Sequence, residues 1–428
     1  MPDNQLDRIY QELGSDICLY PFFGAFYQTN NVIPRAETSR PNSVRPCSIV
    51  RAQDPSKWDI VNQSIVDARN SPAWKQIRAD FLAGKFHDIH DCRDCSYNER
   101  SGTTSPRQMN NKFFSEKFDI DIVEEVREIQ RNDLDVRDII ALDYYPSNYC
   151  NYQCIMCAGG ASSQRQTFEV KFMGRDEKIS LNAPDADFWE ILDRVSIINF
   201  TGGETVLQKQ VLQVMDHLID NQRADSCLIT LLTNASSSPN ELTDRFQHFQ
   251  DVIYNVSIDG TGDVIEYQRR GCDWPTVEAN SLEILNHTNI GCVINFVLTS
   301  VNVLSAMDFV DWCYDHNIGP KKDADNQVSF INISPVFRVD ELGMGALPPS
   351  LREIAQQRLQ QGQDRYRMLD TPMSRFYVTI IQRVLDVISN TAWSQNLTDR
   401  FVEHIRIEDK VSKKKLVEVV PEWQPWFI

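Results

Sequence analysis

The stretch that decides the fold runs from residue 138 to residue 157 and reads DIIALDYYPSNYCNYQCIMC. Residues 138–145 are mostly apolar and aromatic, which is the pattern of a buried strand. Cys150, Cys154 and Cys157 follow, with three residues between the first two and two between the last two. Cysteines at this spacing can ligate three irons of a [4Fe–4S] cube and leave the fourth iron open to a chelating small molecule. The sequence therefore predicts a strand followed by a cluster-binding loop.

Zinc binding and simple burial are the alternatives for these cysteines, because CxxC pairs mark zinc sites and cysteine is often a core residue. The polar neighbours Asn151, Tyr152 and Gln153 make a poor core segment. A zinc site would need a fourth nearby ligand, and no histidine lies between Asp91 and Asp216. The iron–sulfur interpretation is therefore favoured.

Strand-like runs and helical patterns alternate along the chain from residue 138 onward. Six strands with intervening helices predict an α/β fold with a parallel sheet and right-handed crossovers. In such sheets and barrels, functional residues collect at the carboxyl ends of the strands. The expected strands are 138–145, 195–200, 228–233, 252–258, 293–299 and 328–334, and the clearest helical patterns are 210–222, 274–288 and 305–317.

The two ends of the chain differ from this central part. Residues 1–135 contain few long periodic runs, many turn-forming residues and four cysteines, Cys18, Cys47, Cys92 and Cys95. A CxxC pair with two distant cysteines can bind zinc or a second iron–sulfur cluster. The tail from about residue 345 is expected to be mostly helical. The sequence thus indicates a small metal-binding N-terminal domain, an α/β core and a helical C-terminal extension.

Polar residues follow three of the predicted strands where a ligand would bind. Two glycines allow a sharp turn and a close approach of the backbone to a ligand, and an adjacent carboxylate can accept a hydrogen bond from an ammonium group. Ordinary turns and helix caps favour the same residue types, so each group alone is weak evidence. Together they predict a ligand pocket formed by Gly202, Gly203, Glu204, Thr233, Asn234, Ser257 and Asp259.

The three-cysteine loop and the GGE sequence that follows one strand–helix unit later resemble the motifs of the radical S-adenosylmethionine (SAM) enzymes. This resemblance implies a [4Fe–4S] cluster on Cys150, Cys154 and Cys157 and SAM bound at its open iron. It implies that the GGE segment holds the amino end of SAM, with Thr205 where the family often has proline. Arg269 resembles the family's arginine that pairs with the SAM carboxylate, although Arg270 is its direct competitor. Met156 stands where many members place a residue beside the adenine, and its thioether can pack there.

The N-terminal cysteines, together with Glu99, Gly102, Ser105 and Arg107, resemble the auxiliary-cluster module of the twitch-domain radical SAM proteins, here placed before the barrel. The resemblance implies a partial (β/α)6 TIM-like barrel with domains at 1–135, 136–345 and 346–428. It implies an auxiliary [4Fe–4S] cluster ligated by Cys18, Cys47, Cys92 and Cys95. A structural zinc stays open as the alternative, because four-cysteine spacing does not distinguish the metals.

The family resemblance implies an oxidoreductase that cleaves SAM to a 5′-deoxyadenosyl radical and abstracts hydrogen from a substrate carbon. We expect oxidation or cross-linking of a peptide or small metabolite, with the second cluster relaying an electron. An epimerase or methyltransferase is the alternative, and Cys272 is the loop candidate for a thiol hydrogen donor. Cys227, Cys292 and Cys313 fall in apolar elements and are expected to be buried. A flavodoxin- or ferredoxin-like reductant is expected to dock on a basic face to which Arg165 and Arg175 contribute.

Composition limits the remaining possibilities. The chain has 428 residues, a net charge of −17 and 42% hydrophobic residues, as expected for a globular protein with one large core and a smaller domain, or with two ordinary domains. The negative charge argues against general nucleic-acid binding, which needs clustered Lys and Arg. No run reaches the roughly 20 apolar residues of a membrane helix. The N-terminus lacks the pattern of a signal peptide, so we expect a cytoplasmic protein with no membrane association.

Overall fold

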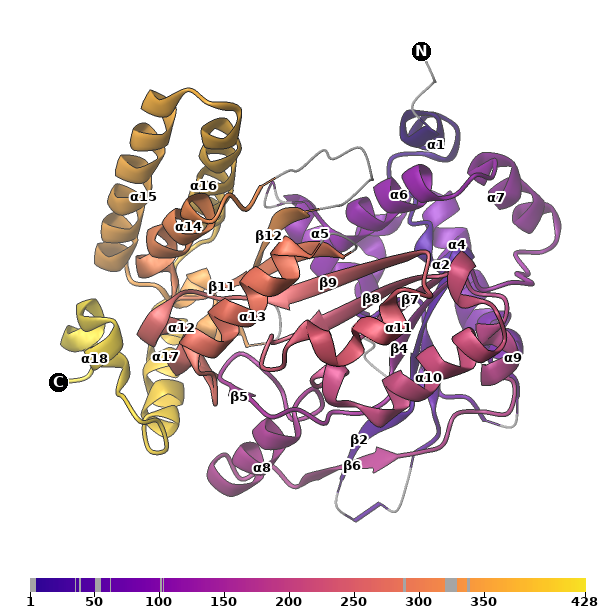
Figure 1. The fold of residues 1–428 in the computed structure, drawn as a ribbon, viewed down its shortest axis with the longest axis horizontal. Coiled ribbons are helices and arrows are strands. Elements are labelled where there is room, and N and C mark those ends of the chain that lie inside the picture. The colour runs from indigo at the N-terminus through magenta and orange to yellow at the C-terminus, as the bar shows by residue number, and fades with distance from the viewer. Residues whose placement is uncertain are drawn as a thin grey trace.

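The structure is a computed structural model that describes residues 5–34, 36–37, 40–50, 55–61, 63–100, 102, 104–287, 290–319, 329–336 and 339–428. An eight-stranded sheet forms its centre (Figure 1). All neighbouring strands are parallel except the last pair, β1 and β3. In spatial order the strands are β12 (Ser329–Pro335), β11 (Gly291–Leu298), β9 (Asp251–Ser257), β8 (Leu228–Thr233), β7 (Ile197–Phe200), β4 (Ala141–Tyr145), β1 (Gly24–Gln28) and β3 (Ser43–Arg45).

The strands predicted after residue 138 are all present as parallel strands of this sheet, and residue 328 of the last prediction lies outside the described residues. The sheet has eight strands rather than the expected six, because β1 and β3 come from the N-terminal part of the chain. Strand β1 pairs with β4 in parallel, and all five of its residues are buried. The expected domain boundary at residue 135 therefore does not coincide with an edge of the sheet.

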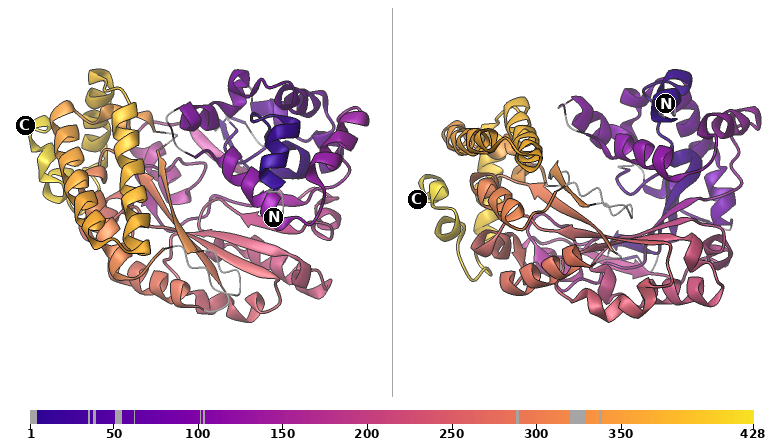
Figure 2. Two further views of the ribbon diagram at one scale, coloured as in Figure 1. Left: turned by 90° about the horizontal axis from the view of Figure 1, so that it is seen from above. Right: turned by 45° about the horizontal axis from the view of Figure 1, so that its top comes forward.

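The two faces of the sheet are covered by different parts of the chain. On one face, Leu142, Ile198 and Ile229 pack in the main core with the helices that connect the strands. On the other face, Ala141, Ile197 and Leu228 pack against N-terminal aromatic and aliphatic residues. Figure 2 shows the connecting helices on one side of the sheet, the N-terminal region on the other, and the C-terminal helices at the β12 end, where they pack against α14. The connecting helices are α10 (Lys209–Asp220), α11 (Thr243–Phe246), α12 (Gly262–Gln268), α13 (Trp274–Asn286) and α14 (Ala306–Asp315).

The terminal regions are largely helical, and two short two-stranded sheets complete the fold. The last α-helix of the C-terminal part is α18 (Leu416–Val419), and a 3-10 helix at Pro421–Trp426 follows it. The short sheets are β2 (Asn30–Pro34) with β6 (Glu177–Leu181) and β5 (Gln153–Cys154) with β10 (Arg269–Arg270). The remaining helices are α1 (Gln5–Leu13), α2 (Tyr20–Phe23), α3 (Ile65–Arg69), α4 (Pro72–Leu82), α5 (Arg93–Arg100), α6 (Pro106–Lys117), α7 (Ile122–Arg131), α8 (Ser163–Phe172), α9 (Phe188–Leu192), α15 (Pro349–Leu369), α16 (Pro372–Asn390) and α17 (Gln395–Glu408).

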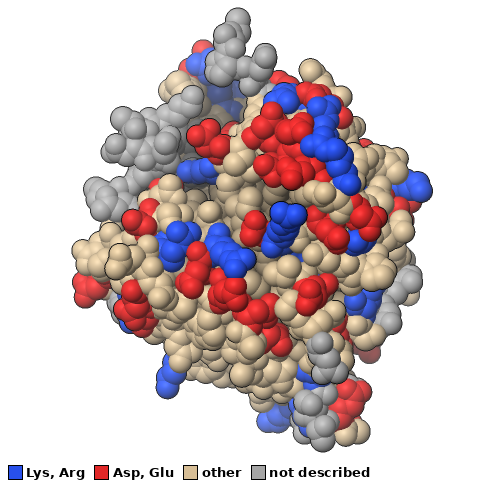
Figure 3. Space-filling model, turned by 90° about the vertical axis from the view of Figure 1, so that its right-hand side faces the viewer, with Lys and Arg blue, Asp and Glu red and all other residues tan. Residues whose placement is uncertain are grey.

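The surface carries both signs of charge. On the face shown in Figure 3, Lys and Arg side chains lie interspersed among Asp and Glu side chains. Charged side chains of both signs are therefore neighbours on that face. Within the described part of the chain, no helix combines the length and apolar character that a membrane span requires.

The C-terminal segment is anchored by Trp423, which is fully buried. Its ring stacks on Phe401 of α17 with 4.2 Å between the centroids, and its Nε1 donates to the Ser300 carbonyl at 3.2 Å. Ser300 lies in the loop that follows β11. The last residues of the chain are therefore part of the packing around the end of the sheet.

Replacing Trp423 with alanine should lower the free energy of unfolding by about 3–5 kcal/mol, because it leaves a cavity against Phe401 and an unpaired carbonyl. Chemical denaturation monitored by circular dichroism would measure this loss. Trp393, whose ring is 41% exposed, provides the matched control, and its replacement should cost about 1 kcal/mol or less. Equal losses for the two variants would contradict the anchoring role of Trp423.

Candidate functional site

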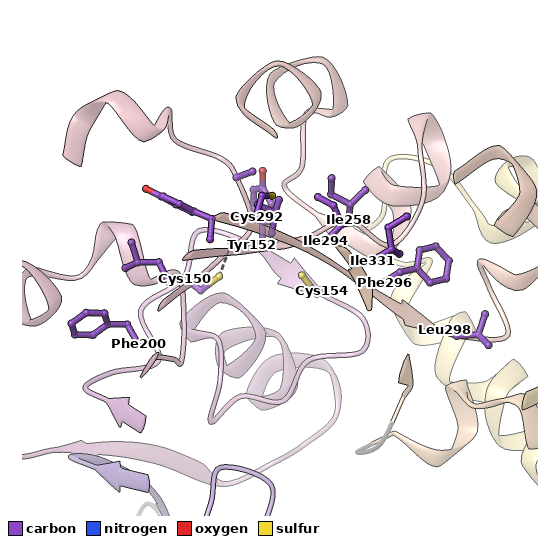
Figure 4. Close-up of a cluster of buried hydrophobic side chains, with 14 of the residues drawn as sticks. Cys150, Tyr152, Cys154, Phe200, Ile258, Cys292, Ile294, Phe296, Leu298 and Ile331 are labelled. Atoms are coloured by element: carbon purple, nitrogen blue, oxygen red, sulfur yellow. Dashed lines mark hydrogen bonds between the residues drawn. The ribbon is translucent and has the colours of Figure 1, made fainter. Parts of the chain in front are cut away.

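The cysteine loop lies directly after β4, at the carboxyl end of the parallel strands. Cys154 belongs to β5, whose partner β10 places Arg269 opposite Cys154 and Arg270 opposite Gln153. The Ile155 amide donates to the Gln268 carbonyl at 2.9 Å, which extends this pairing. Figure 4 shows Cys150 and Cys154 on this loop beside the strand ends. The loop is thus held by backbone pairing rather than by its cysteines alone.

The sulfur atoms of the loop are surrounded by N–H donors. The Tyr152 amide donates to Cys150 Sγ at 3.4 Å, and Asn234 Nδ2 lies 3.9 Å from the same sulfur. Arg269 Nη1 lies 4.0 Å from Cys154 Sγ. Hydrogen bonds to sulfur favour the thiolate and tune the ligands of iron–sulfur clusters. This donor set fits thiolate ligands of a metal cluster.

Burial opposes ionisation of the same thiols. It raises the pKa of Cys150 to about 11 and the pKa of Cys154 well above its usual value. Cys157, the third member, is half-buried. The thiolate is the form that binds metal, so a bound cation must supply the stabilisation that burial removes. The buried thiols of the loop therefore stay protonated and unreactive until a positively charged centre binds them.

The GGE loop after β7 packs tightly on the cysteine loop. Gly202 and Gly203 have φ values of +80° and +51°. A Cβ on Gly203 would lie 2.1 Å from the Tyr149 carbonyl oxygen, and one on Gly202 would lie 1.5 Å from the Tyr145 ring. The Glu204 amide donates to the Tyr149 carbonyl at 2.8 Å. Only glycine allows this approach of the two loops.

The Glu204 carboxylate is almost fully buried and joins the GGE loop to the end of β8. It accepts from Thr233 Oγ1 and from the Asn234 amide, both at 2.6 Å. Burial raises the pKa of Glu204 to about 7. The Asn234 side chain in turn donates to Asn151 Oδ1 at 2.9 Å. Glu204, Thr233 and Asn234, which the sequence predicted as one pocket, are thus one hydrogen-bonded group that reaches Cys150.

Asp259 and Arg269 form a second buried group beside Cys154. Arg269 Nη2 and Asp259 Oδ2 are 2.7 Å apart, and the Val297 amide donates to Asp259 Oδ1 at 2.7 Å. Asp259 is fully buried, and its Oδ2 has the ion-pair contact with Arg269 but accepts no hydrogen bond from the described residues. Burial lowers the pKa of Arg269, but the Asp259 carboxylate more than offsets this and keeps that pKa above its usual value. Asp259 therefore orients a permanently charged guanidinium next to the cysteine loop.

The other predicted residues near the loop are less tightly connected. Ser257 ends β9, is partly exposed, and no hydrogen bond of its hydroxyl is found among the described residues. Met156 is partly buried and packs against the main core. Cys272 lies close to Arg269 and Tyr152, and burial raises its pKa to about 12, which keeps it a neutral thiol. Cys227, Cys292 and Cys313 are buried, as the sequence predicted.

The four N-terminal cysteines come together in one cavity, although they are far apart in the sequence. Cys18, Cys47, Cys92 and Cys95 line it, together with Tyr20, Ser48, Asp91, Phe86 and Arg107 among others. Burial raises the pKa of Cys18 to about 12 and that of Cys95 to about 11, and it also raises those of Cys47 and Cys92. Neighbouring thiols raise the pKa of Cys18, Cys47 and Cys92 further, so an unligated group of four thiolates is unfavourable.

Helix α6 fixes the segment that carries Cys18. Asn111 Nδ2 donates to the Ile17 carbonyl at 2.8 Å, and its Oδ1 accepts from the Leu19 amide at 2.9 Å. Arg107 is held by Glu99 at 2.7 Å and donates to the Ile17 carbonyl as well. Ser105 caps the helix and donates to Glu99 at 2.5 Å. The predicted residues Glu99, Ser105 and Arg107 therefore support the cysteine cavity.

No three Cys, His, Asp or Glu side chains in the described part of the chain are placed to share a single metal ion. A cube-shaped cluster binds each thiolate to a different iron and holds the sulfurs farther apart than one ion does. The four-cysteine cavity and the three-cysteine loop each supply thiols, the donor type of such a cluster.

Sequence reasoning missed a polar chain across the sheet. Thr230 Oγ1 donates to Asn199 Oδ1 at 2.7 Å, and Asn199 Nδ2 donates to Asp143 Oδ1 at 2.6 Å. These residues stand in register on β8, β7 and β4. Burial raises the pKa of Asp143 to about 6, while donors such as Tyr20 and Ser48 oppose this. A charged residue inside an apolar strand pattern was the signal for this chain.

The expected role of Arg165 is wrong. Its side chain is only 2% exposed and pairs with Glu169 at 3.3 Å and with Glu408 at 2.5 Å, so it is not part of a basic docking face. An arginine with two carboxylate partners is stable inside a protein, and the sequence alone does not reveal these partners. Arg175 is half-exposed, although it pairs with Glu169 at 3.2 Å.

Comparison with known proteins yields no family model and no curated protein that matches the chain. Among solved structures, native anSMEcpe with bound AdoMet is similar, with 16% identity and a TM-score of 0.38 over 52% of this chain and 59% of that one. Streptococcus suis SuiB bound to S-adenosylmethionine has 14% identity and a TM-score of 0.35, over 71% and 64% of the two chains. SuiB bound to precursor peptide SuiA has 13% identity and a TM-score of 0.36, over 79% and 70%. This likeness is too weak to assign a family.

Replacing Gly203 with alanine should destabilise the protein by more than the roughly 1–2 kcal/mol of a left-handed backbone, because the added Cβ collides with the Tyr149 carbonyl. It should also reduce the iron bound after anaerobic reconstitution. The control is Gly84→Ala, because Gly84 has a similar φ of +69° and nothing within 4 Å of its Cβ position. If both variants lose equal stability and keep full iron, the close approach of the two loops has no role in the site.

Proposed function

We propose that the protein is a radical SAM enzyme. The single observation that carries this proposal is the contact between the GGE loop and the three-cysteine loop at the carboxyl end of the parallel strands. The two sequence motifs are far apart along the chain. They are joined by the hydrogen bond from the Glu204 amide to the Tyr149 carbonyl and by the close approach of Gly203 to the same carbonyl. When bound, the cluster would supply the electron that cleaves SAM into methionine and a 5′-deoxyadenosyl radical, which abstracts hydrogen from a substrate carbon.

The chain's own residues would bind and orient SAM. Cys150, Cys154 and Cys157 would ligate the [4Fe–4S] cluster. The GGE loop, with Gly202, Gly203 and Glu204, would hold the amino end of SAM, and Arg269 would pair with its carboxylate. The buried Asp259 keeps Arg269 in place, which leaves the guanidinium's remaining N–H groups for the ligand. Ser257, Thr233, Asn234 and Met156 would complete the pocket around the ribose and adenine.

Burial in the pocket serves the proposed chemistry in a second way. Cys150, Cys154, Tyr152 and Glu204 are each less than a tenth exposed. Excluding water strengthens electrostatic interactions and protects reactive intermediates from side reactions. The site is therefore suited to chemistry that must proceed out of contact with solvent.

Four cysteines in one N-terminal cavity support the proposal of an auxiliary [4Fe–4S] cluster in a twitch-like domain before the barrel-like core. Cys18, Cys47, Cys92 and Cys95 would ligate it, and it would relay an electron during oxidation or cross-linking of a peptide or small metabolite. Four buried thiols, with Arg107 as the one cation among the described residues that line their cavity, need a positively charged centre to ionise. A flavodoxin- or ferredoxin-like protein would reduce the first cluster, and the proposed location is the cytoplasm.

The wild-type protein, reconstituted anaerobically and reduced with dithionite, should convert SAM to 5′-deoxyadenosine. Cys154→Ala should abolish this conversion, because it removes a ligand that no other described residue replaces. Chromatographic quantification of 5′-deoxyadenosine measures the effect. Cys227→Ala is the control, because Cys227 is buried in the core away from both cysteine groups, and it should retain cleavage. Retained cleavage in Cys154→Ala would refute the proposed function.

A variant with Cys150, Cys154 and Cys157 all changed to alanine separates the two proposed clusters. We expect it to retain on the order of four irons and four sulfides per chain after reconstitution, because the N-terminal cavity keeps its full set of cysteines. Iron and sulfide analysis together with zinc determination would measure this. Iron near zero with one zinc retained would make the N-terminal site structural and remove the electron relay from the proposal.

A further inference from the structure

A buried carboxylate of the C-terminal extension, Glu408, has no part in the function proposed above. It lies at the end of α17, and its side chain is fully buried. Glu408 Oε1 is 2.5 Å from Arg165 Nη1, and Glu408 Oε2 is 2.7 Å from Arg270 Nη2. His404 Nε2 lies 3.2 Å from Oε1. Each oxygen of one carboxylate therefore binds a different arginine.

The two arginines come from opposite sides of the cysteine loop. Arg165 lies in the first turn of α8, which begins shortly after Cys157. Arg270 belongs to β10, next to Arg269, and pairs across the short sheet with Gln153. The Arg270 Nη1 group also donates to Gln153 Oε1. Through Arg270 of β10 and Arg165 of α8, Glu408 thus connects the short β5–β10 sheet, which holds Cys154, with the helix that follows Cys157.

A second carboxylate extends this connection to the loop backbone. Arg165 Nε pairs with Glu169 Oε1 at 3.3 Å, and the Gly159 amide donates to Glu169 Oε2 at 3.1 Å. A Cβ on Gly159 would lie 2.8 Å from the same oxygen, so the contact is close. The path from α17 to the backbone beside Cys157 therefore runs through Glu408, Arg165 and Glu169.

The extension also holds the helix that leads to Arg269. The Tyr267 hydroxyl of α12 donates to Asp409 Oδ1 at 2.7 Å, and Lys414 pairs with Asp263. Both ends of α12 are thereby tied to residues that follow α17. Residues at and after the end of α17 therefore position both Arg269 and the cysteine loop.

Stability alone gives little reason to bury such a network. Removing charges from water is costly, and well-packed apolar side chains of similar volume are often at least as stable as a buried ion pair. Charged hydrogen bonds have strict distances and directions, so they specify geometry where apolar contacts would permit sliding. The network is therefore best explained by the geometry that it imposes on the residues it connects.

We propose that Glu408 is a positioning residue through which the C-terminal extension sets the conformation of the cysteine loop and the place of Arg269. The expected effect of Glu408 on SAM binding rests on the function proposed above. Its expected effect on the conformation of the cysteine loop does not. Loss of the carboxylate charge would release Arg165 and Arg270 together. The loop would then hold its thiols and Arg269 less firmly against an incoming ligand.

The test compares Glu408→Gln with Glu403→Gln, which changes an exposed residue of the same helix. The glutamine keeps the shape of Glu408 and removes its charge. Hydrogen exchange of residues 146–162 is measured by mass spectrometry on the full chain without metal. Exchange in this segment should be faster in Glu408→Gln and unchanged in Glu403→Gln, while the strands of the central sheet keep their protection.

The second measurement is the dissociation constant for SAM, determined anaerobically by equilibrium dialysis on reconstituted proteins of equal iron and sulfide content. Glu408→Gln should weaken SAM binding by about 10-fold or more, the usual cost of losing a supporting contact of a metal site. Its electron paramagnetic resonance spectrum with SAM should differ from that of the wild type. Glu403→Gln should match the wild type in both measurements.

If Glu408→Gln does not fold, Arg270→Gln takes its place, because it removes the contacts of Arg270 with Glu408, Gln153 and the Phe168 ring and leaves Arg165 paired with Glu408. This variant should weaken SAM binding and leave the exchange of residues 159–165 unchanged. Unchanged loop exchange and unchanged SAM affinity in a folded variant, with only lower overall stability, would overturn the proposal. A wild-type protein that binds no SAM would refute the proposed function instead, and the exchange experiment would still decide the role of Glu408.

Discussion

Burial of cysteine thiols is the constraint on which this structure depends. Both groups of thiols sit where ionisation is unfavourable, as the raised pKa values of Cys150, Cys18 and Cys95 show. A thiolate in such a place needs a cation and N–H donors. Around the cysteine loop these donors come from Tyr152, Asn234 and Arg269, which lie in different parts of the chain. The parallel sheet brings them to one edge, so fold and site are inseparable.

Charged side chains extend this arrangement beyond the loop. Asp259 holds Arg269 from the end of β9, and Glu408 holds Arg270 from the end of α17. Carboxylates from different regions of the chain therefore hold the two adjacent arginines, whose side chains have different neighbours. Arg269 faces Cys154, while Arg270 secures the strand on which both residues lie. The two arginines, between which the sequence left the choice open, thus have different carboxylate partners.

Much of the fold was predictable, because apolar runs separated by helical patterns are local features of the chain. The strands β4, β7, β8, β9, β11 and β12 and the helices α10, α13 and α14 lie where those patterns predicted them. β1 and β3 were missed because strands of five and three residues among turn-forming residues are too short to show a clear alternation. The role expected for Arg165 was wrong because its partner Glu408 is distant in sequence. The chain of Asp143, Asn199 and Thr230 was missed because register between strands is a tertiary property.

The sequence by itself determined the chemical inventory and its local order: three closely spaced cysteines after a strand, a double glycine with a carboxylate, and four further cysteines near the N-terminus. Spacing of residues along a short segment limits which ligands can share a centre, so these features are readable without coordinates. Only the tertiary structure decided that the N-terminal cysteines share one cavity and that the GGE loop touches the cysteine loop. It also decided that Glu408 of the C-terminal extension reaches Arg165 and Arg270. These contacts depend on how strands pair and how buried charges find partners, and both are decided by long-range packing.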